Sequence, residues 1–306
     1  MQLRKLYRKV KVVNKDSLIR ETIDSIMARR IGEGGFSQCD KGNFNPVATA
    51  WASLALVSDP QKNEMVQIAL KKLSSIQGTD GRIVTSNGPQ DSFWPTFPAI
   101  FSWRKVGGFD HEIEKAIKFV LSTSGKHWKK NKTSVVGHDP SLIGWPWIEN
   151  THSWIEPTSM ALLALKACGQ STHNRVNQAV NMILDRQLPT GGWNYGNTGV
   201  FGKTLRPEPE STGLALTAIA GYVELSEVVL SITYLKNQYE KIKTPLALSW
   251  TLFGLACWKE RPKDYESRIK DSFKLQERYG KYDTSYLSKL VVAYKAECDL
   301  LNFVKT

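Results

Sequence analysis

Apolar residues recur along the chain with the spacing of amphipathic helices. In six segments they fall at i, i+3, i+4 and i+7, with charged residues on the opposite face, which predicts helices on the outside of the fold. These segments are residues 16–30, 61–76, 110–124, 173–187, 225–238 and 265–279. Each is paired with a segment that is rich in small residues and apolar on all sides, which is typical of a helix buried on both faces. These second segments are residues 46–57, 95–103, 157–168, 211–222, 245–258 and 284–294.

Six helical hairpins with few strand signals predict an all-α fold. We expect two concentric rings of helices, an (α/α)6 barrel or toroid, that forms one domain over residues 1–306. An open solenoid of the same repeats is the alternative. Closure is favoured because an open superhelix would expose its terminal helix pairs, and neither end of this chain is conspicuously polar.

A glycine-rich turn joins the outer and inner helices. Its fullest copy is "RQLPTGGWNYG" at 186–196, in which Gln187 ends an outer helix and Trp193 packs as the chain turns inward. Weaker copies are Gln77 to Gly81 and Gly34-Gly35-Phe36. The pattern resembles the QW-type repeat of the squalene-cyclase and protein-prenyltransferase superfamily, over most of the chain. The resemblance implies an α/α toroid in which the repeat ties outer helices together.

Composition limits the classes of function. Hydrophobic residues at 41% and a formal net charge of +12 describe a basic globular chain that attracts anions. No apolar run is long enough to span a membrane and no secretion signal begins the chain, so a cytoplasmic location is expected. The basic charge predicts salt-sensitive contact with anionic membranes, and we expect no specific binding of nucleic acid. The four cysteines are far apart and predict neither a disulfide framework nor a zinc site.

Acidic side chains gather where inner helices begin. Aligning the six starts places Asn45, Trp94, Glu156, Glu210, Thr244 and Asp283 at one level. Helix capping explains each carboxylate taken singly. Glu156, Glu210 and Asp283 together form a candidate catalytic set. The candidate binding residues near them are Trp94, Trp145, Trp147, His152, Trp154, Trp193, Tyr195 and Arg206.

A cavity lined by aromatic rings and a few carboxyls suits carbocation chemistry. Ring faces stabilise positive charge, and an apolar pocket raises the pKa of an acid so that it can donate a proton. Glu156 is favoured as the acid because Trp145, Trp147 and Trp154 can shield it, whereas Arg206 would hold Glu210 ionised.

The resemblance adds an expectation for each branch of the superfamily. In the cyclases the acid is an Asp two residues before a Thr, and Glu156-Pro157-Thr158 and Glu210-Ser211-Thr212 match that frame with Glu in place of Asp. In the prenyltransferases zinc is held by Asp-x-Cys and a later His. Thr158 or Thr212 stands at the Cys position here, so we expect no zinc and no other cofactor.

The sequence therefore predicts a terpene-cyclase-like or prenyltransferase-like enzyme that binds a hydrophobic isoprenoid. The alternatives are a non-catalytic lipid-binding or scaffold protein of the same fold, and a glycan-processing α/α-barrel that uses the same carboxylates as an acid/base pair. His138-Asp139 is a candidate acid/base pair, although Asp-Pro is an ordinary turn signal and the turn is favoured. Asp91, before an inner helix, either faces the mouth or starts a turn. Lys203 and Arg206 either hold a diphosphate or carboxylate near Glu210 or belong to a solvated loop.

Overall fold

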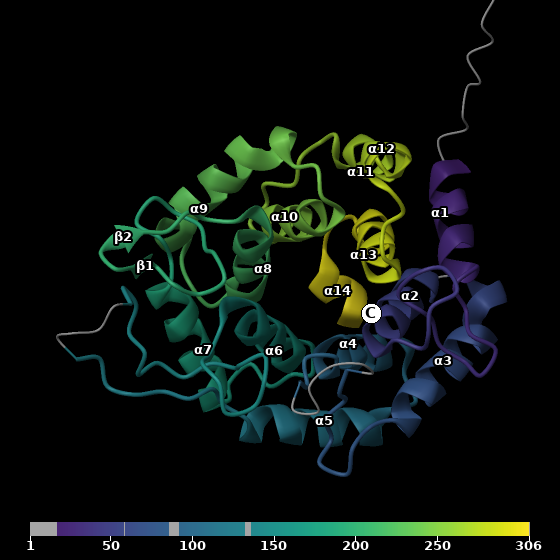
Figure 1. Cartoon of the computed structure of the whole chain (residues 1–306), viewed down its shortest axis with the longest axis horizontal. Coiled ribbons are helices and arrows are strands. Elements are labelled where there is room, and N and C mark those ends of the chain that lie inside the picture. Colours follow the sequence, from purple (N-terminus) through teal and green to yellow (C-terminus); the bar gives the residue numbers. More distant parts are fainter. Residues whose placement is uncertain (1–16, 58, 86–91, 132–135, 306) are drawn as a thin grey trace, which may run out of the picture.

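The helices form two concentric rings that close on themselves (Figure 1). The computed structural model describes residues 17–57, 59–85, 92–131 and 136–305. The inner helices are α2 (Pro46–Leu56), α4 (Thr96–Val106), α6 (Ile155–Ala167), α8 (Pro209–Ile219), α10 (Pro245–Cys257) and α13 (Thr284–Lys295). Each packs against the next, and α13 packs against α2. The all-α toroid is confirmed, and the open solenoid is excluded.

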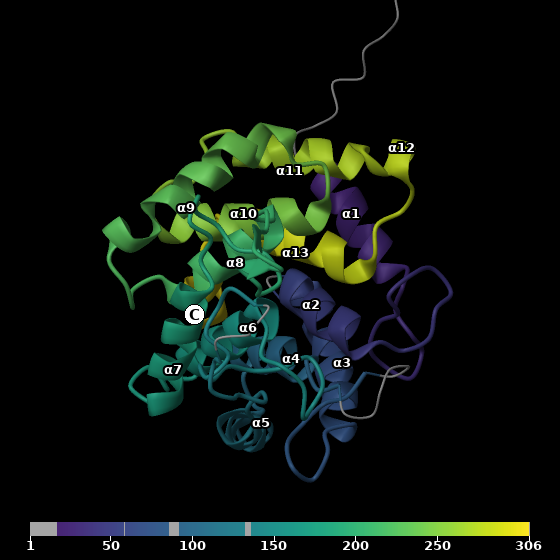
Figure 2. The same ribbon diagram turned by 60° about the vertical axis from the view of Figure 1, so that its left-hand side comes forward.

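Amphipathic helices form the outer ring (Figure 2). They are α1 (Ser17–Met27), α3 (Asn63–Ser75), α5 (Asp110–Ser122), α7 (Asn174–Asp185), α9 (Leu225–Gln238) and α11 (Tyr265–Lys274). Short elements complete the described chain: the 3₁₀ turns Pro60–Lys62 and Tyr239–Lys241, the strands β1 (Gly199–Val200) and β2 (Lys203–Thr204), and the helices α12 (Gln276–Tyr279) and α14 (Leu300–Lys305).

The inner helices are buried nearly throughout, as their composition predicted. All eleven residues of α2 are buried. In α6 every residue is buried except Glu156, in the first turn, and Lys166, in the last. The charged residues of α6 therefore lie at its two ends and mark the two openings of the barrel.

Helices α8 and α10 approach each other most closely through two glycines. A Cβ added to Gly213 would lie 2.3 Å from the carbonyl oxygen of Trp250, and one added to Gly254 would lie 2.9 Å from the Cα of Gly213. These distances are shorter than a van der Waals contact, so backbone meets backbone at this crossing. The inner ring requires glycine at both positions.

A threonine in the first turns of four inner helices anchors the incoming loop. Its Oγ1 accepts a hydrogen bond of 2.9 Å from a backbone N–H in the preceding glycine-rich turn. The donor and acceptor pairs are Phe36 and Thr49, Ile83 and Thr96, Trp145 and Thr158, and Trp193 and Thr212. The Thr of both Glu-x-Thr frames is therefore a structural residue.

Replacing Thr212 by Val should destabilise the fold. The change keeps the shape of the side chain but leaves the buried N–H of Trp193 without a partner, which costs about 1–3 kcal/mol. Urea unfolding of T212V measures the loss. Thr233→Val is the control, since Thr233 is exposed and its hydroxyl bonds only within α9. Equal stabilities of T212V and T233V would contradict the anchoring role.

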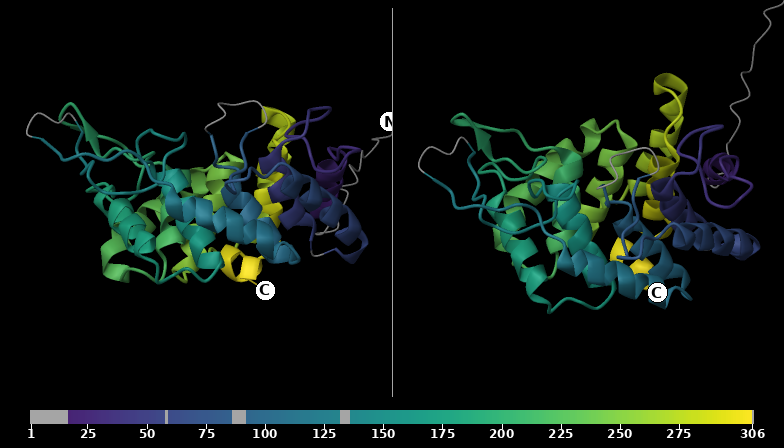
Figure 3. Two further views of the ribbon diagram at one scale, coloured as in Figure 1. Left: turned by 90° about the horizontal axis from the view of Figure 1, so that it is seen from below. Right: turned by 60° about the horizontal axis from the view of Figure 1, so that its bottom comes forward.

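The two ends of the barrel differ (Figure 3). The β1–β2 hairpin and the connections that precede the inner helices project from one end, which we call the mouth, whereas α14 lies at the other. Helix α14 packs against α4 and α6 at that second end. No helix among the described residues is long and apolar enough to cross a membrane.

Candidate active site

The six aligned residues at the mouth have different roles. Asn45 and Thr244 are helix caps: Asn45 Oδ1 accepts from the N–H of Ala48 at 2.9 Å, and Thr244 Oγ1 accepts from that of Ala247 at 3.4 Å. Asp283 Oδ2 accepts from Gln38 Nε2 at 3.2 Å. Trp94 packs edge to face on Trp147 with ring centroids 6.0 Å apart.

Glu156 and Glu210 do not act as caps. Neither carboxyl group accepts a hydrogen bond from the described residues, although both lie in the first turn of an inner helix. Both are partly exposed and line one small hollow between α6, α8 and α10, which Leu246 and Trp250 close from the side of α10. The structure thus brings two of the three predicted carboxylates to one hollow, and no described residue donates a hydrogen bond to either of them.

Burial changes the acidity of Glu156. It raises the pKa of this carboxyl from 4.5 to about 7, with a further upward contribution from the negative charge of Glu210 and an opposing one from Lys289. A carboxyl with a pKa near 7 holds a proton that it can release at neutral pH. The raised pKa agrees with what the sequence led us to expect of Glu156, and its role as an acid stays a prediction.

The raised pKa should be visible in stability. Between pH 4.5 and 7 the folded protein retains the proton of Glu156 while the unfolded chain releases it, so this group's contribution to stability is lost as pH rises. Glu156→Gln does not titrate. As pH rises from about 5 to about 8, we expect the free energy of unfolding of E156Q to increase relative to that of wild type, as measured by urea unfolding. A difference that does not change with pH would contradict the raised pKa.

Two of the predicted lining residues lie elsewhere. Trp145 and Trp193 are fully buried between the rings. Their indole N–H groups donate to carbonyl oxygens of outer helices, Trp145 to Val120 at 2.9 Å and Trp193 to Ile183 at 2.6 Å. They were predicted to line the binding cavity. Instead, each indole hydrogen-bonds its connection to the preceding outer helix.

The other predicted residues are dispersed along the connections. His152 lies in a partly buried cluster, with its Nε2 3.2 Å from that of His138 and its ring against Trp154. Arg206 is exposed, and the described residues show no contact between its guanidinium and the carboxyl of Glu210. Tyr195 is 59% exposed, and its pKa is raised by burial and by the charges of Glu210, Glu208 and Glu156, which places its hydroxyl near the carboxylates.

The lesser candidates have local roles. Asp139 Oδ1 accepts from the backbone N–H of Ser141 at 2.9 Å, which fits the predicted turn. Lys203 lies exposed on β2. Asp91 lies outside the described residues. Within the part of the chain that the structure describes, no group of three or more His, Cys, Asp or Glu side chains is placed to hold a metal ion.

Sequence reasoning missed three residues of the inner wall. Trp250 lines the hollow, and Lys289 and Tyr286 project from α13. The Nζ of Lys289 lies 4.7 Å from the ring centroid of Trp51 and 5.6 Å from that of Tyr286. A signal for Lys289 was present, because it is a lone charge in the middle of the apolar segment "TSYLSKLVVAY".

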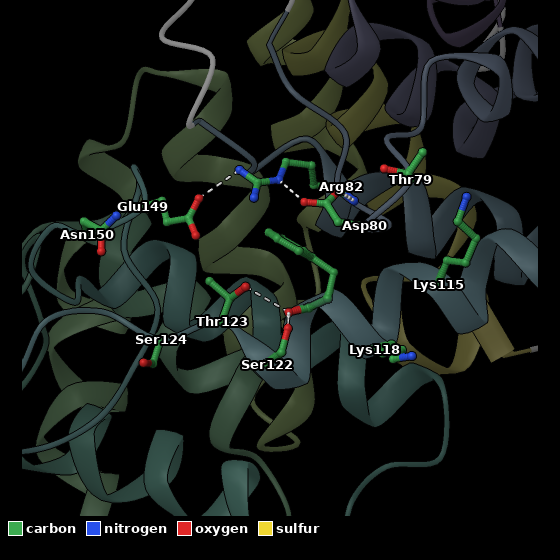
Figure 4. Close-up of a pocket in the computed structure, with 11 residues that line it drawn as sticks. Thr79, Asp80, Arg82, Lys115, Lys118, Ser122, Thr123, Ser124, Glu149 and Asn150 are labelled. Carbon is green, nitrogen blue, oxygen red and sulfur yellow. Dashed lines mark hydrogen bonds and ion pairs between the residues drawn. The ribbon is translucent and has the colours of Figure 1, made fainter.

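A larger pocket lies outside the ring, beside Arg82 (Figure 4). It has a volume of about 560 Å³ between α5 and two loops. The guanidinium of Arg82 lies between two carboxylates, with Asp80 at 2.5 Å and Glu149 at 2.9 Å. These ion pairs join the loop after α3 to the loop before α6. The ion pairs tie down the connection that leads into α6.

The hollow at Glu156 and Glu210 is small. Its space of about 10 Å³ holds roughly one water molecule. Pockets that enclose a small organic ligand have volumes of about 300–1,000 Å³. This hollow is therefore far smaller than a pocket that would hold an isoprenoid chain.

Comparisons with solved structures agree with the fold. A mannotetraose complex of an inactive variant of an α-1,6-mannanase from a Salegentibacter species superposes with a TM-score of 0.63 at 12% identity, over 94% of this chain and 100% of that one. A family 76 glycoside hydrolase (mannosidase) from Bacteroides thetaiotaomicron gives 0.54 at 11% identity, over 94% and 98%. A protein from Actinoplanes gives 0.57 at 15%, over 96% and 100%. No protein-family model and no curated protein matches the sequence.

These findings overturn the resemblance on which the first functional prediction rested. The similar structures are family 76 mannanases rather than terpene cyclases or prenyltransferases. The prediction of an isoprenoid or lipid ligand is likewise wrong, since the complexes in this group contain mannooligosaccharides. The resemblance misled because the Gln-and-Trp pattern determines how helices pack and not which reaction is catalysed. Gln187 donates to Ser231 on α9, and Trp193 donates to Ile183 on α7.

Proposed function

We propose that the protein is a glycan-processing enzyme that cleaves a glycosidic bond at the mouth of the toroid. The observation that carries the proposal is the pair of free carboxyls, Glu156 and Glu210, at one hollow, with the pKa of Glu156 raised to about 7. Glycoside hydrolysis needs two carboxyl groups, one to protonate the leaving oxygen and one to act as base or nucleophile. Glu156 is the acid and Glu210 is its partner.

The surroundings suit a sugar better than a hydrocarbon. Both glutamates are partly exposed in the first turns of their helices, so a polar chain that lies across the mouth approaches them without entering the barrel. Tyr195 is exposed and its hydroxyl senses the charges of Glu210 and Glu156, and Trp250 forms one wall of the hollow. Aromatic rings offer flat apolar surfaces against which the C–H faces of a sugar can pack.

The similar structures support the substrate class, with a difference in the acids. One of these mannanases was studied as an inactive variant with two consecutive aspartates replaced. The present sequence contains no two consecutive aspartates. In our proposal Glu156 and Glu210, on neighbouring inner helices, supply the two carboxyls that the reaction requires.

A panel of oligosaccharides tests the proposal. Wild-type protein is incubated with α-1,6-mannooligosaccharides and with other α- and β-linked oligosaccharides, and products are followed by mass spectrometry and by release of reducing ends. We expect cleavage of at least one α-linked member. Glu114→Gln, an exposed change on α5, is the control and should leave that activity unchanged. Absence of cleavage across the panel would contradict the proposal.

A further inference from the structure

Lys289 is the only basic residue of the six inner helices that lies away from their last turns. The other basic residues of these helices are Arg104, Lys105, Lys166 and Lys295. They lie at the end opposite the mouth, where two of them bond to backbone carbonyls: Lys166 to that of Ala220 and Lys295 to that of Ala55. Lys289 has no such structural partner among the described residues.

The side chain of Lys289 is held in place without an ion pair. It is 6% exposed, and its ammonium group lies over the rings of Trp51 and Tyr286. Aromatic faces attract a cation but do not neutralise it. A buried ammonium without a carboxylate in contact lowers stability, and in a cleft such a group is a candidate for function.

The charged groups that face Lys289 are few. The mouth-side halves of α2, α4 and α10 contain no titratable side chain. The other three inner helices contribute the remaining titratable groups. These are Glu156 on α6, Glu210 on α8 with Glu208 before it, and Tyr286 on α13 with Asp283 before it. Burial lowers the pKa of Lys289 to about 8, while the charges of Glu156 and then Asp283 favour its protonated form. The Trp51 ring, 4.7 Å from the Nζ of Lys289, packs edge to face on Trp250 with ring centroids 6.2 Å apart, and Trp250 lines the hollow of Glu156. Lys289 is thus the one cation of the inner helices on the mouth side of their last turns.

We propose that Lys289 is a positioning residue that stabilises the carboxylate left on Glu156 when this acid has given up its proton. The inference rests on the proposed role of Glu156 as proton donor. The proton moves from the Glu156 carboxyl to the leaving glycosidic oxygen, and the negative charge that remains on Glu156 is balanced by the ammonium of Lys289. Without this cation the negative charge would form on Glu156 beside Glu210, with no counter-ion on the inner helices at the mouth.

Titration of Glu156 tests the inference without any substrate. Carboxyl carbons of glutamate are labelled with ¹³C, and the Glu156 signal is identified by its absence from the spectrum of E156Q. The wild-type signal should titrate with a midpoint near pH 7. In Lys289→Met the midpoint should rise by on the order of one pH unit, because the cation that favours the carboxylate is gone. In Lys289→Arg, which keeps the charge, it should stay close to wild type.

Lys295→Met is the matched control, because Lys295 lies on the same helix but at the opposite end of the barrel. It should leave the titration of Glu156 unchanged. With a cleaved oligosaccharide, K289M should lower kcat more than it raises KM and move the alkaline limb of the pH profile upward, while K289R restores both. An unchanged Glu156 midpoint in folded K289M, or equal shifts in K289M and K295M, would overturn the inference. Either result is independent of whether a substrate has been found.

Discussion

Glu156→Gln should lower turnover of a cleaved oligosaccharide by about 10²–10⁴-fold, the contribution of a general acid. Gln keeps the size of the side chain and its polar end but has no proton to give to the leaving oxygen. The protein should fold normally, since Glu156 makes no described hydrogen bond that Gln would break. Initial rates for wild type and variant, at equal concentrations of folded protein, measure the effect.

The partner carboxylate and the pH profile complete this prediction. Glu210→Gln should also reduce turnover severely, because the second carboxyl acts on the sugar from the neighbouring helix. Wild-type kcat should fall as pH rises through about 7, where Glu156 loses its proton. If E156Q cleaves at the wild-type rate, or if E114Q is as slow as E156Q, Glu156 is not the acid.

Gly213→Ala should cause a large loss of stability. The added methyl group would lie 2.3 Å from the carbonyl oxygen of Trp250 and 2.4 Å from its carbonyl carbon. No rotation of a side chain relieves a contact with backbone, so α8 and α10 must move apart. Overpacking of this kind costs typically about 1–3 kcal/mol and occasionally more, and we expect at least the upper value here.

Urea unfolding of G213A measures this loss, and Gly32→Ala is its control. A Cβ on Gly32 meets no atom within 4 Å, and the residue is not in the left-handed region, so G32A should be close to neutral. Because Glu210 and Trp250 lie on the two helices that are forced apart, G213A should also weaken catalysis. A folded G213A with wild-type stability would show that the two inner helices are not in backbone contact.

The fold was predictable from the sequence because burial determines the pattern of each helix. The outer segments show a charged face and the inner segments do not, and this difference alone places them in two rings. Glu156 and Glu210 were predictable as well, since both stand at the start of an inner helix in a short motif with Thr. Their freedom from capping bonds was not predictable, because Asn45 and Thr244 occupy the same level and do form caps.

The errors came from features that serve packing. Trp145 and Trp193 lie in the connections that lead to Glu156 and Glu210, but each indole donates to an outer helix, a direction that sequence spacing does not reveal. Lys289 was overlooked because Trp51, whose ring its ammonium lies over, and Glu156, whose charge favours its protonated form, are on α2 and α6, far away along the chain. The closed ring brings these three residues together, and only the three-dimensional structure shows it.

A crystal structure of E156Q in complex with an oligosaccharide that wild type cleaves tests the central claim most directly. We predict that the sugar lies across the mouth, with the oxygen of the cleaved bond within hydrogen-bond distance of the side chain at position 156. Glu210 should face the same sugar ring. A complex in which the sugar binds only elsewhere, for example in the pocket beside Arg82, with no sugar atom near residues 156 and 210, would contradict the account.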